Sequence, residues 1–187
     1  MTSLNLTPTI LMHGSWGPQK NIELGLMTLN KLKREGVKFR LVISGGLNPH
    51  FPEYKRKFQE LLHCYSEVID EYLGPVTEKD IMKIFLDAHL LILPYNTPGG
   101  HSAVLEQAMF FEVPNIAIDF PEFREQANGT SNVKLVSHAE FPFALACCLE
   151  SLEGMRKIYI NGKIMLVGAN IRRILDYAMD TKGKKIE

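Results

Sequence analysis

The sequence is poor in cysteine and shows no spacing that would hold a metal ion or a disulfide framework. Its three cysteines are Cys64, Cys147 and Cys148, and the last two are adjacent in an apolar segment of helical character. A buried thiol is the ordinary outcome at such a place. We therefore predict no metal site, and a reducing, cytoplasmic compartment as the simplest location.

Long apolar runs and an excess of one charge are also missing. No run approaches the roughly 18 residues that a membrane-spanning helix needs, and the N-terminal Met-Thr-Ser-Leu-Asn lacks the charged and apolar parts of a signal peptide. The formal net charge at pH 7 is +0, with basic and acidic residues interleaved. We expect neither a membrane span in this chain nor a nucleic-acid partner.

Two common nucleotide-binding fingerprints are absent. The turn Gly14–Asn21 lacks the Gly-x-Gly-x-x-Gly spacing of dinucleotide-binding proteins, and no Gly-Lys-Ser/Thr triplet of a Walker loop occurs. These absences weaken an assignment as an oxidoreductase or NTPase. Lys20 nevertheless stands near the start of a predicted helix, where a lysine neutralises a phosphate through a charge-assisted hydrogen bond. The alternative for Lys20 is a solvated lysine at a helix start.

Short apolar runs alternate with amphipathic segments along the chain. The pattern predicts strands at Thr9–His13, Phe39–Ser44, Glu67–Leu73, Leu90–Leu93, Asn115–Asp119 and Val133–Val136. It predicts helices at Asn21–Glu35, Pro52–Leu62, Glu78–Leu86, Ser102–Phe111, Phe141–Leu152 and Lys163–Met179. This alternation favours an α/β, Rossmann-like, doubly wound parallel sheet of about six strands with helices on both faces. We expect one domain over residues 1–187, with a frayed tail at 180–187.

Glycine-bearing turns follow the first four predicted strands. They are Gly14–Gly17, Gly45-Gly46, Gly74 and Gly99-Gly100. Ligands of open parallel sheets bind at the carboxyl ends of the strands, so these turns should converge on one site. For any single turn, glycine as simple turn punctuation remains the alternative.

The stretch Pro94–Pro114 combines a strand end, a glycine turn and a helix with Glu106 about one turn inside. A helix N-terminus binds phosphate through free N–H groups and the helix dipole, and a nearby carboxylate accepts hydrogen bonds from sugar hydroxyls. The stretch therefore suggests a nucleotide or a nucleotide sugar. His101 directly precedes the helix and is a candidate for a sugar or phosphate contact. The alternatives are an exposed turn histidine and a surface glutamate.

Two further groups are weaker candidates. His13 ends the first predicted strand, where a satisfied core histidine is the favoured interpretation. The pair Arg124-Glu125 follows the fifth predicted strand, where surface ion pairing is favoured over a role in a cleft.

A resemblance to one family covers nearly the whole chain. It is carried by Gly14-Ser15-Trp16-Gly17-Pro18-Gln19-Lys20-Asn21, Leu41–Gly46, Tyr72–Val76 with Asp87-Ala88, and Leu93-Pro94 through Glu106-Gln107-Ala108-Met109 to Val113-Pro114. In order and spacing these segments resemble the C-terminal, donor-binding half of the GT-B glycosyltransferases. They are most similar to the large retaining family 4, the glycosyl transferases of group 1.

The resemblance implies roles for individual residues. Glu106 would hold the ribose hydroxyls of the donor, and Lys20 would meet its diphosphate, with Gly14 and Ser15 in the same turn. Gly74 and Val76 would lie by the nucleotide base. The turn at Gly99, Gly100, His101 and Ser102 would present backbone N–H groups to the phosphates or the sugar.

Two residues depart from the family pattern. Ser15 stands where the family has an arginine that accompanies the lysine on the diphosphate, and Pro98 stands where the first of two glutamates contacts the transferred sugar. The negative charge that develops on the leaving diphosphate would therefore be stabilised by one cation fewer than in the family pattern. No catalytic residue is assigned, and the pattern indicates donor binding more firmly than catalysis.

The resemblance implies a retaining glycosyltransferase that transfers a hexosyl unit from a nucleoside-diphosphate sugar to a glycan or lipid-linked acceptor, without a metal. Such enzymes have a second, N-terminal domain, so we expect a missing domain or partner subunit, any membrane-surface contact through that missing part, and an isolated chain that is inactive. The alternatives are a non-catalytic nucleotide-binding or regulatory module of the same fold, or a nucleotide-sugar epimerase.

Overall fold

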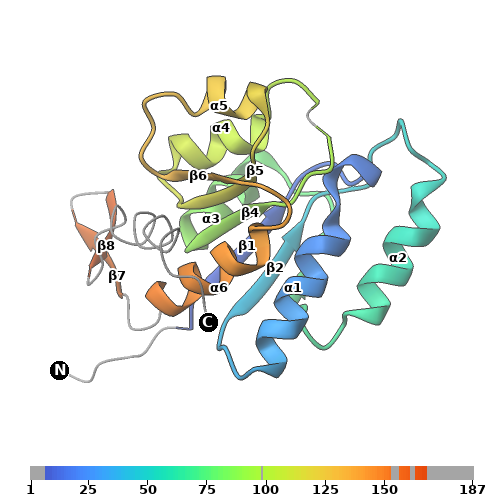
Figure 1. The fold of residues 1–187 in the computed structure, drawn as a ribbon, viewed down its shortest axis with the longest axis horizontal. Coiled ribbons are helices and arrows are strands. Elements are labelled where there is room, and N and C mark those ends of the chain that lie inside the picture. Colours follow the sequence, from blue (N-terminus) through green and yellow to red (C-terminus); the bar gives the residue numbers. More distant parts are fainter. Residues whose placement is uncertain (1–6, 98, 153–155, 161–162, 168–187) are drawn as a thin grey trace, which may run out of the picture.

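The structure is a computed structural model that describes residues 7–97, 99–152, 156–160 and 163–167. Its centre is a six-stranded sheet with the order β3-β2-β1-β4-β5-β6, in which every neighbouring pair is parallel (Figure 1). The strands are β1 (Thr9–His13), β2 (Arg40–Ser44), β3 (Glu71–Tyr72), β4 (Leu90–Leu93), β5 (Asn115–Ile118) and β6 (Val133–Val136).

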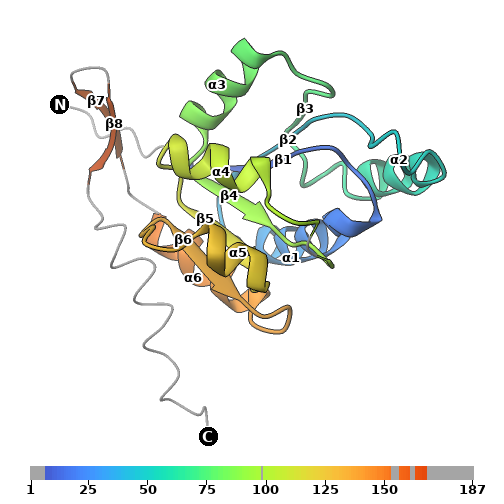
Figure 2. The ribbon, with the colours of Figure 1, turned by 90° about the horizontal axis from the view of Figure 1, so that it is seen from above.

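Helices cover both faces of this sheet (Figure 2). They are α1 (Ile22–Arg34), α2 (Tyr54–Cys64), α3 (Glu78–Asp87), α4 (Ala103–Phe110), α5 (Pro121–Gln126) and α6 (Phe141–Leu152). Buried residues of α1, α2 and α6 form one apolar cluster against the sheet, and those of α3, α4 and α5 form a second cluster on the opposite face. The predicted Rossmann-like sheet of about six parallel strands with helices on both faces is confirmed.

Central strands are apolar at every position because both of their faces are covered. All four residues of Leu90–Leu93 are buried. Helix starts follow equally local rules: Thr77 and Asp80 form a reciprocal capping box at α3. Within the described residues, no helix is long and apolar enough to cross a membrane.

The third strand is shorter than the predicted Glu67–Leu73, because only Glu71–Tyr72 pair as a strand. Asp70 accounts for part of the difference. Its carboxylate accepts the Leu41 N–H at 2.8 Å, so a side chain replaces a backbone carbonyl just before the strand begins. Helix α5 was not predicted; it begins at Pro121, whose fixed φ and missing N–H suit a first helical position.

The predicted helix Lys163–Met179 is wrong at its start. Residues Lys163–Val167 form strand β8, which pairs antiparallel with β7 (Arg156–Ile160). In the sequence, Asn161-Gly162 separates the two strands, and this dipeptide strongly favours hairpins. The strand pairing agrees with this turn signal and not with the helical spacing of the apolar residues. The rest of the predicted helix and the predicted tail at 180–187 lie outside the described residues.

Three of the glycine turns are hydrogen-bonded to one another at the carboxyl edge of the sheet. Gly14 N–H donates to the Ser44 carbonyl at 3.2 Å, Trp16 N–H to that of Gly46 at 2.8 Å, and Gly45 N–H to that of Gly74 at 2.6 Å. Gly45 has a φ of +102°, and a Cβ atom built on it would overlap the Gly14 carbonyl. The predicted convergence of these turns is therefore present in the fold.

We predict that Gly45→Ala lowers the free energy of unfolding by about 2 to 4 kcal/mol, because it adds both backbone strain and a clash with Gly14. The matched control is Gly129→Ala, where φ is +78° but nothing lies within 4 Å of the new Cβ. Strain alone should cost about 1 kcal/mol there. Urea unfolding of both variants measures the difference, and equal losses would contradict the packing role of Gly45.

Candidate functional site

The first turn and the start of α4 lie side by side at the carboxyl edge. A Cβ atom on Gly14 would lie 3.6 Å from Val104 Cγ2. Asn96, in the loop after β4, completes the junction, because its N–H donates to the Gln19 carbonyl at 2.9 Å and its side-chain amide donates to the Pro18 carbonyl at 3.3 Å. Asn96 thus holds the short 3₁₀ helix η1 (Pro18–Lys20), which carries Lys20.

Lys20 is a half-buried cation at this junction. Its Nζ lies 3.8 Å from the centre of the Tyr95 ring, a cation–π contact. Burial lowers the pKa of Lys20 to about 8. Among the described residues, no carboxylate lies within ion-pair distance of Lys20, so its charge is free to meet an anion.

His13 is buried, and it lies close enough to Lys20 for the charge of the lysine to act on its ring. Its Nδ1 lies 2.8 Å from Ser44 Oγ, and its ring packs edge-on against Phe85. Burial, with the charge of Lys20 as a second cause, lowers the pKa of His13 to about 4. His13 is therefore a neutral, hydrogen-bonded core histidine, as the favoured interpretation held.

Helix α4 begins at a side-chain cap that is itself held from α5. Ser102 Oγ accepts the Leu105 N–H at 3.3 Å. The Ser102 N–H donates to Gln126 Oε1 at 2.9 Å, and Gln126 Nε2 donates back to the Ser102 carbonyl at 2.8 Å. The Ser102 N–H is therefore already paired, contrary to the expectation that it would be offered to a phosphate.

The remaining predicted residues of this stretch are exposed. Gly99, Gly100 and His101 form an open turn before α4, and Glu106 is exposed in the first turn of the helix. Glu106 N–H donates to the Ser102 carbonyl at 3.0 Å, so the same cap that begins the helix also places Glu106. Lys20, the α4 start and Glu106 are thus brought to one edge of the fold.

At Ser15, one of the two departures from the family pattern, the structure offers no second free cation among the described residues, and Pro98, the other departure, lies outside them. Ser15 is exposed, and its neighbour Trp16 is buried and stacked on Phe58. Arg124 is exposed and forms two hydrogen bonds to the Asp119 carboxylate, at 2.6 and 2.7 Å. Arg124 is a surface ion pair, as favoured, although its partner is Asp119 and not the adjacent Glu125.

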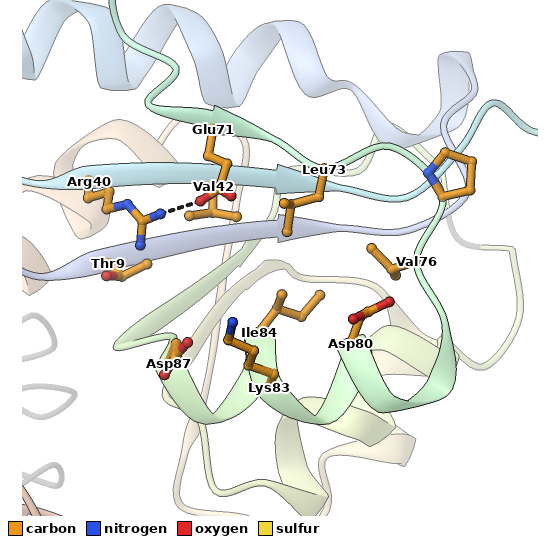
Figure 3. Close-up of a pocket in the computed structure, with 11 residues that line it drawn as sticks. Thr9, Arg40, Val42, Glu71, Leu73, Val76, Asp80, Lys83, Ile84 and Asp87 are labelled. Carbon is orange, nitrogen blue, oxygen red and sulfur yellow. Dashed lines mark hydrogen bonds and ion pairs between the residues drawn. The ribbon is translucent and has the colours of Figure 1, made fainter.

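The loop Gly74–Val76 faces a different hollow. Val76 and Pro75 line one end of a groove of about 420 Å³ between α3 and strands β1 to β3 (Figure 3). Apolar side chains such as Val42 and Ile84 line the groove, and an ion pair between Arg40 and Glu71 lies near its other end. Val76 alone among the predicted site residues lines this groove, and Gly74 is joined to the first turn through Gly45.

Sequence reasoning missed Tyr95, Asn96 and Gln126. The first two lie in the loop just after β4, and a polar residue at the carboxyl end of a central strand is a signal that points to a site. Gln126 gave no signal, because its partner Ser102 lies 24 residues away in the sequence.

Residues 7–152 match the sequence model of the family described as Glycosyl transferases group 1. The chain belongs to this family. The match includes every predicted site residue from Gly14 to Glu106. A search of curated proteins gave no match.

Solved structures of glycosyltransferases share the fold. HepE of Anabaena, solved in complex with UDP, is 13% identical, and the match covers 93% of this chain and 44% of HepE with a TM-score of 0.66. A glycosyltransferase from Rickettsia africae is 16% identical, over 94% of this chain and 42% of that protein, with a TM-score of 0.62. Sucrose-phosphate synthase from Thermosynechococcus elongatus is 19% identical, and the match covers 75% of this chain and 34% of that protein with a TM-score of 0.61. This chain spans less than half the length of these structures.

We predict an acid-induced loss of stability that originates at His13. Its folded-state pKa is about 4 against an ordinary 6.5, so the unfolded chain binds a proton that the folded chain refuses as the pH falls from 6.5 to 4. Between pH 7 and 4.5 this linkage should cost roughly 2 to 3 kcal/mol. Urea unfolding at both pH values should show that much extra loss in the native protein relative to His13→Asn. Parallel pH profiles would contradict it.

Proposed function

We propose that the chain is the donor-binding half of a nucleotide-sugar glycosyltransferase. The observation that carries the proposal is the position of Lys20, a half-buried cation without a carboxylate partner among the described residues, which packs on Tyr95 and follows the turn that meets the start of α4 at Gly14 and Val104. A cation and a helix start together favour an anionic ligand. The family assignment makes a nucleoside-diphosphate sugar the leading candidate, and the complexes of HepE with UDP and UDP-glucose support a uridine nucleotide as the first ligand to test.

Each part of the site has a proposed task. Lys20 neutralises the diphosphate, and the free N–H groups at the α4 start, with the turn Gly99–His101 and the turn at Gly14 and Ser15, surround it. Glu106 accepts hydrogen bonds from the ribose hydroxyls, and Gly74 and Val76 border the base. The protein supplies this positive charge itself, so we propose that no metal is required. Within the described residues, no group of three or more histidine, cysteine, aspartate or glutamate side chains is arranged to hold a metal ion.

The finer proposals follow the family. We place the chain in retaining family 4, as the C-terminal domain formed by residues 1–187, with a hexosyl donor and a glycan or lipid-linked acceptor. Acceptor binding falls to a separate N-terminal domain or partner subunit, so the chain alone should transfer no sugar efficiently. The proposed location is the cytoplasm, or the membrane surface through that other part.

A non-catalytic regulatory module is the second candidate, favoured by one observation. Ser15 replaces the second cation, and Arg124, on the helix that follows β5, is neutralised by Asp119. Sugar transfer by the chain together with its partner domain would exclude this candidate, and isomerisation of a sugar nucleotide without an acceptor would instead indicate an epimerase.

We predict that Glu106→Ala weakens UDP binding about 10- to 100-fold, because a carboxylate hydrogen bond contributes roughly 1.5–3 kcal/mol. The loss should vanish for 2′,3′-dideoxy-UDP, which lacks the hydroxyls that Glu106 would hold. Glu150→Ala, which removes an exposed carboxylate from α6, is the control. Calorimetry with UDP, GDP and ADP measures these affinities. If none of the three nucleotides binds at millimolar concentration, the proposed function is contradicted. If Glu106→Ala loses as much affinity for 2′,3′-dideoxy-UDP as for UDP, the ribose role of Glu106 is contradicted.

We predict that UDP affinity falls as the pH rises above 8. In the free protein the pKa of Lys20 is about 8, and a bound diphosphate stabilises the charged form and so raises this pKa. Above pH 8 the binding reaction must take up a proton, and affinity should fall by up to about tenfold per pH unit. Lys20→Arg, which stays charged, should remove the dependence. Identical calorimetric profiles of the two proteins between pH 7 and 9.5 would contradict the assignment of Lys20.

A further inference from the structure

We infer that Gln126 is a positioning residue of the donor site, acting through the backbone of Ser102; this rests on the proposed function. The carboxamide of Gln126 pairs with both the N–H and the carbonyl of Ser102, the residue that caps the N-terminus of α4. Its Oε1 accepts the Ser102 N–H at 2.9 Å and its Nε2 donates to the Ser102 carbonyl at 2.8 Å. Gln126 is not among the predicted site residues, and α5, which carries it, is not among the predicted helices.

The pairing reproduces that of a neighbouring strand. The planar amide of Gln126 donates one hydrogen bond and accepts another, and so fixes the peptide groups on both sides of Ser102. Ser102 itself is buried. Without Gln126, a buried N–H would lose its only partner in the described part of the chain. The Ser102 cap would then turn toward another partner or open to water.

The consequence reaches the ligand because Ser102 sets which N–H groups of α4 are free. The Ser102 N–H is taken by Gln126, the Leu105 N–H by Ser102 Oγ and the Glu106 N–H by the Ser102 carbonyl. The N–H groups of Ala103 and Val104, in the first turn, have no acceptor within the helix. They are the pair left for a phosphate, next to the turn at Gly14.

Gln126 also secures one end of the connection between β4 and α4. Asn96 ties the β4 end of this connection to η1, and Gln126 ties the α4 end to α5. Between them Gly99, Gly100 and His101 are exposed. The two amides thus hold the phosphate-facing turn between Lys20 on one side and the helix start on the other.

The test compares UDP affinity of the native chain, Gln126→Ala and Gln126→Glu by calorimetry at pH 8 and pH 5. Gln126→Ala should bind UDP roughly tenfold more weakly at both pH values, from the loss of two hydrogen bonds. Gln126→Glu should be at least as weak at pH 8, because a carboxylate only accepts and cannot donate to the Ser102 carbonyl. A carboxylate held against the Ser102 carbonyl favours its protonated form, which regains one donor and one acceptor in the same places as the pH falls toward 5, so the affinity should rise toward the native value.

Other titrating groups around the turn, among them His101 and Glu106 on the α4 side and Glu122, Arg124 and Glu125 on α5, are common to all three proteins. The ratio of affinities at each pH therefore isolates position 126. Gln107→Ala, which removes another half-buried carboxamide from α4, is the matched control and should stay within about twofold of the native affinity.

The outcomes separate the two proposals. Recovery of Gln126→Glu at acid pH, with none for Gln126→Ala, supports the positioning role, since a purely structural contribution would lower thermal stability without restoring affinity. Native affinity in both variants, or weak binding without acid recovery, overturns the positioning role and leaves the proposed function intact. Absence of UDP, GDP and ADP binding by the native chain overturns the proposed function and this inference with it.

Discussion

The close contact of Gly14 with its neighbours is the constraint on which the carboxyl edge of this fold depends. Its carbonyl occupies the place where a side chain on Gly45 would stand, and its own Cα faces Val104 at the start of α4. Parallel pairing of β1 with both β2 and β4 brings these segments to the same edge. Because the backbones approach without side chains between them, the turns of β1 and β2 and the start of α4 form one continuous surface.

In the free protein this surface carries a positive charge, on Lys20, that no carboxylate of the described residues balances. Burial lowers the pKa of Lys20 to about 8, and the buried His13 near it stays neutral. A half-buried ammonium without a carboxylate partner within the described structure costs free energy that a bound anion would offset. The same reasoning explains why Arg124 is a poor second cation: its charge already meets Asp119. One cation and one helix N-terminus therefore favour binding of a diphosphate more than they favour its release as a leaving group.

Much of the fold could be predicted from local patterns. Leu90–Leu93 could only be a buried strand at its length, and the apolar stripe of α1 and the Thr77 cap of α3 gave helix positions to within a residue or two. Errors arose where a distant or competing partner decides. The Asp70 carboxylate shortens β3 by pairing with Leu41, and Lys163–Val167 pairs with Arg156–Ile160 as a strand although its apolar residues have helical spacing.

The candidate site divides in the same way. Lys20 and Glu106 could be named from glycine turns and helix starts, whose chemistry is local. The amides of Asn96 and Gln126, which hold the segments that carry Lys20 and Glu106, bind backbone groups 78 and 24 residues away, and no sequence pattern predicts such a pair. Binding of a nucleoside diphosphate at the carboxyl edge can be followed by titrating the ¹⁵N-labelled chain with UDP and recording amide chemical shifts. We expect the largest shifts at Gly14, Lys20 and the first turn of α4. Unchanged shifts at millimolar UDP, or shifts confined to the α3 groove at Val42 and Ile84, would contradict binding at this edge.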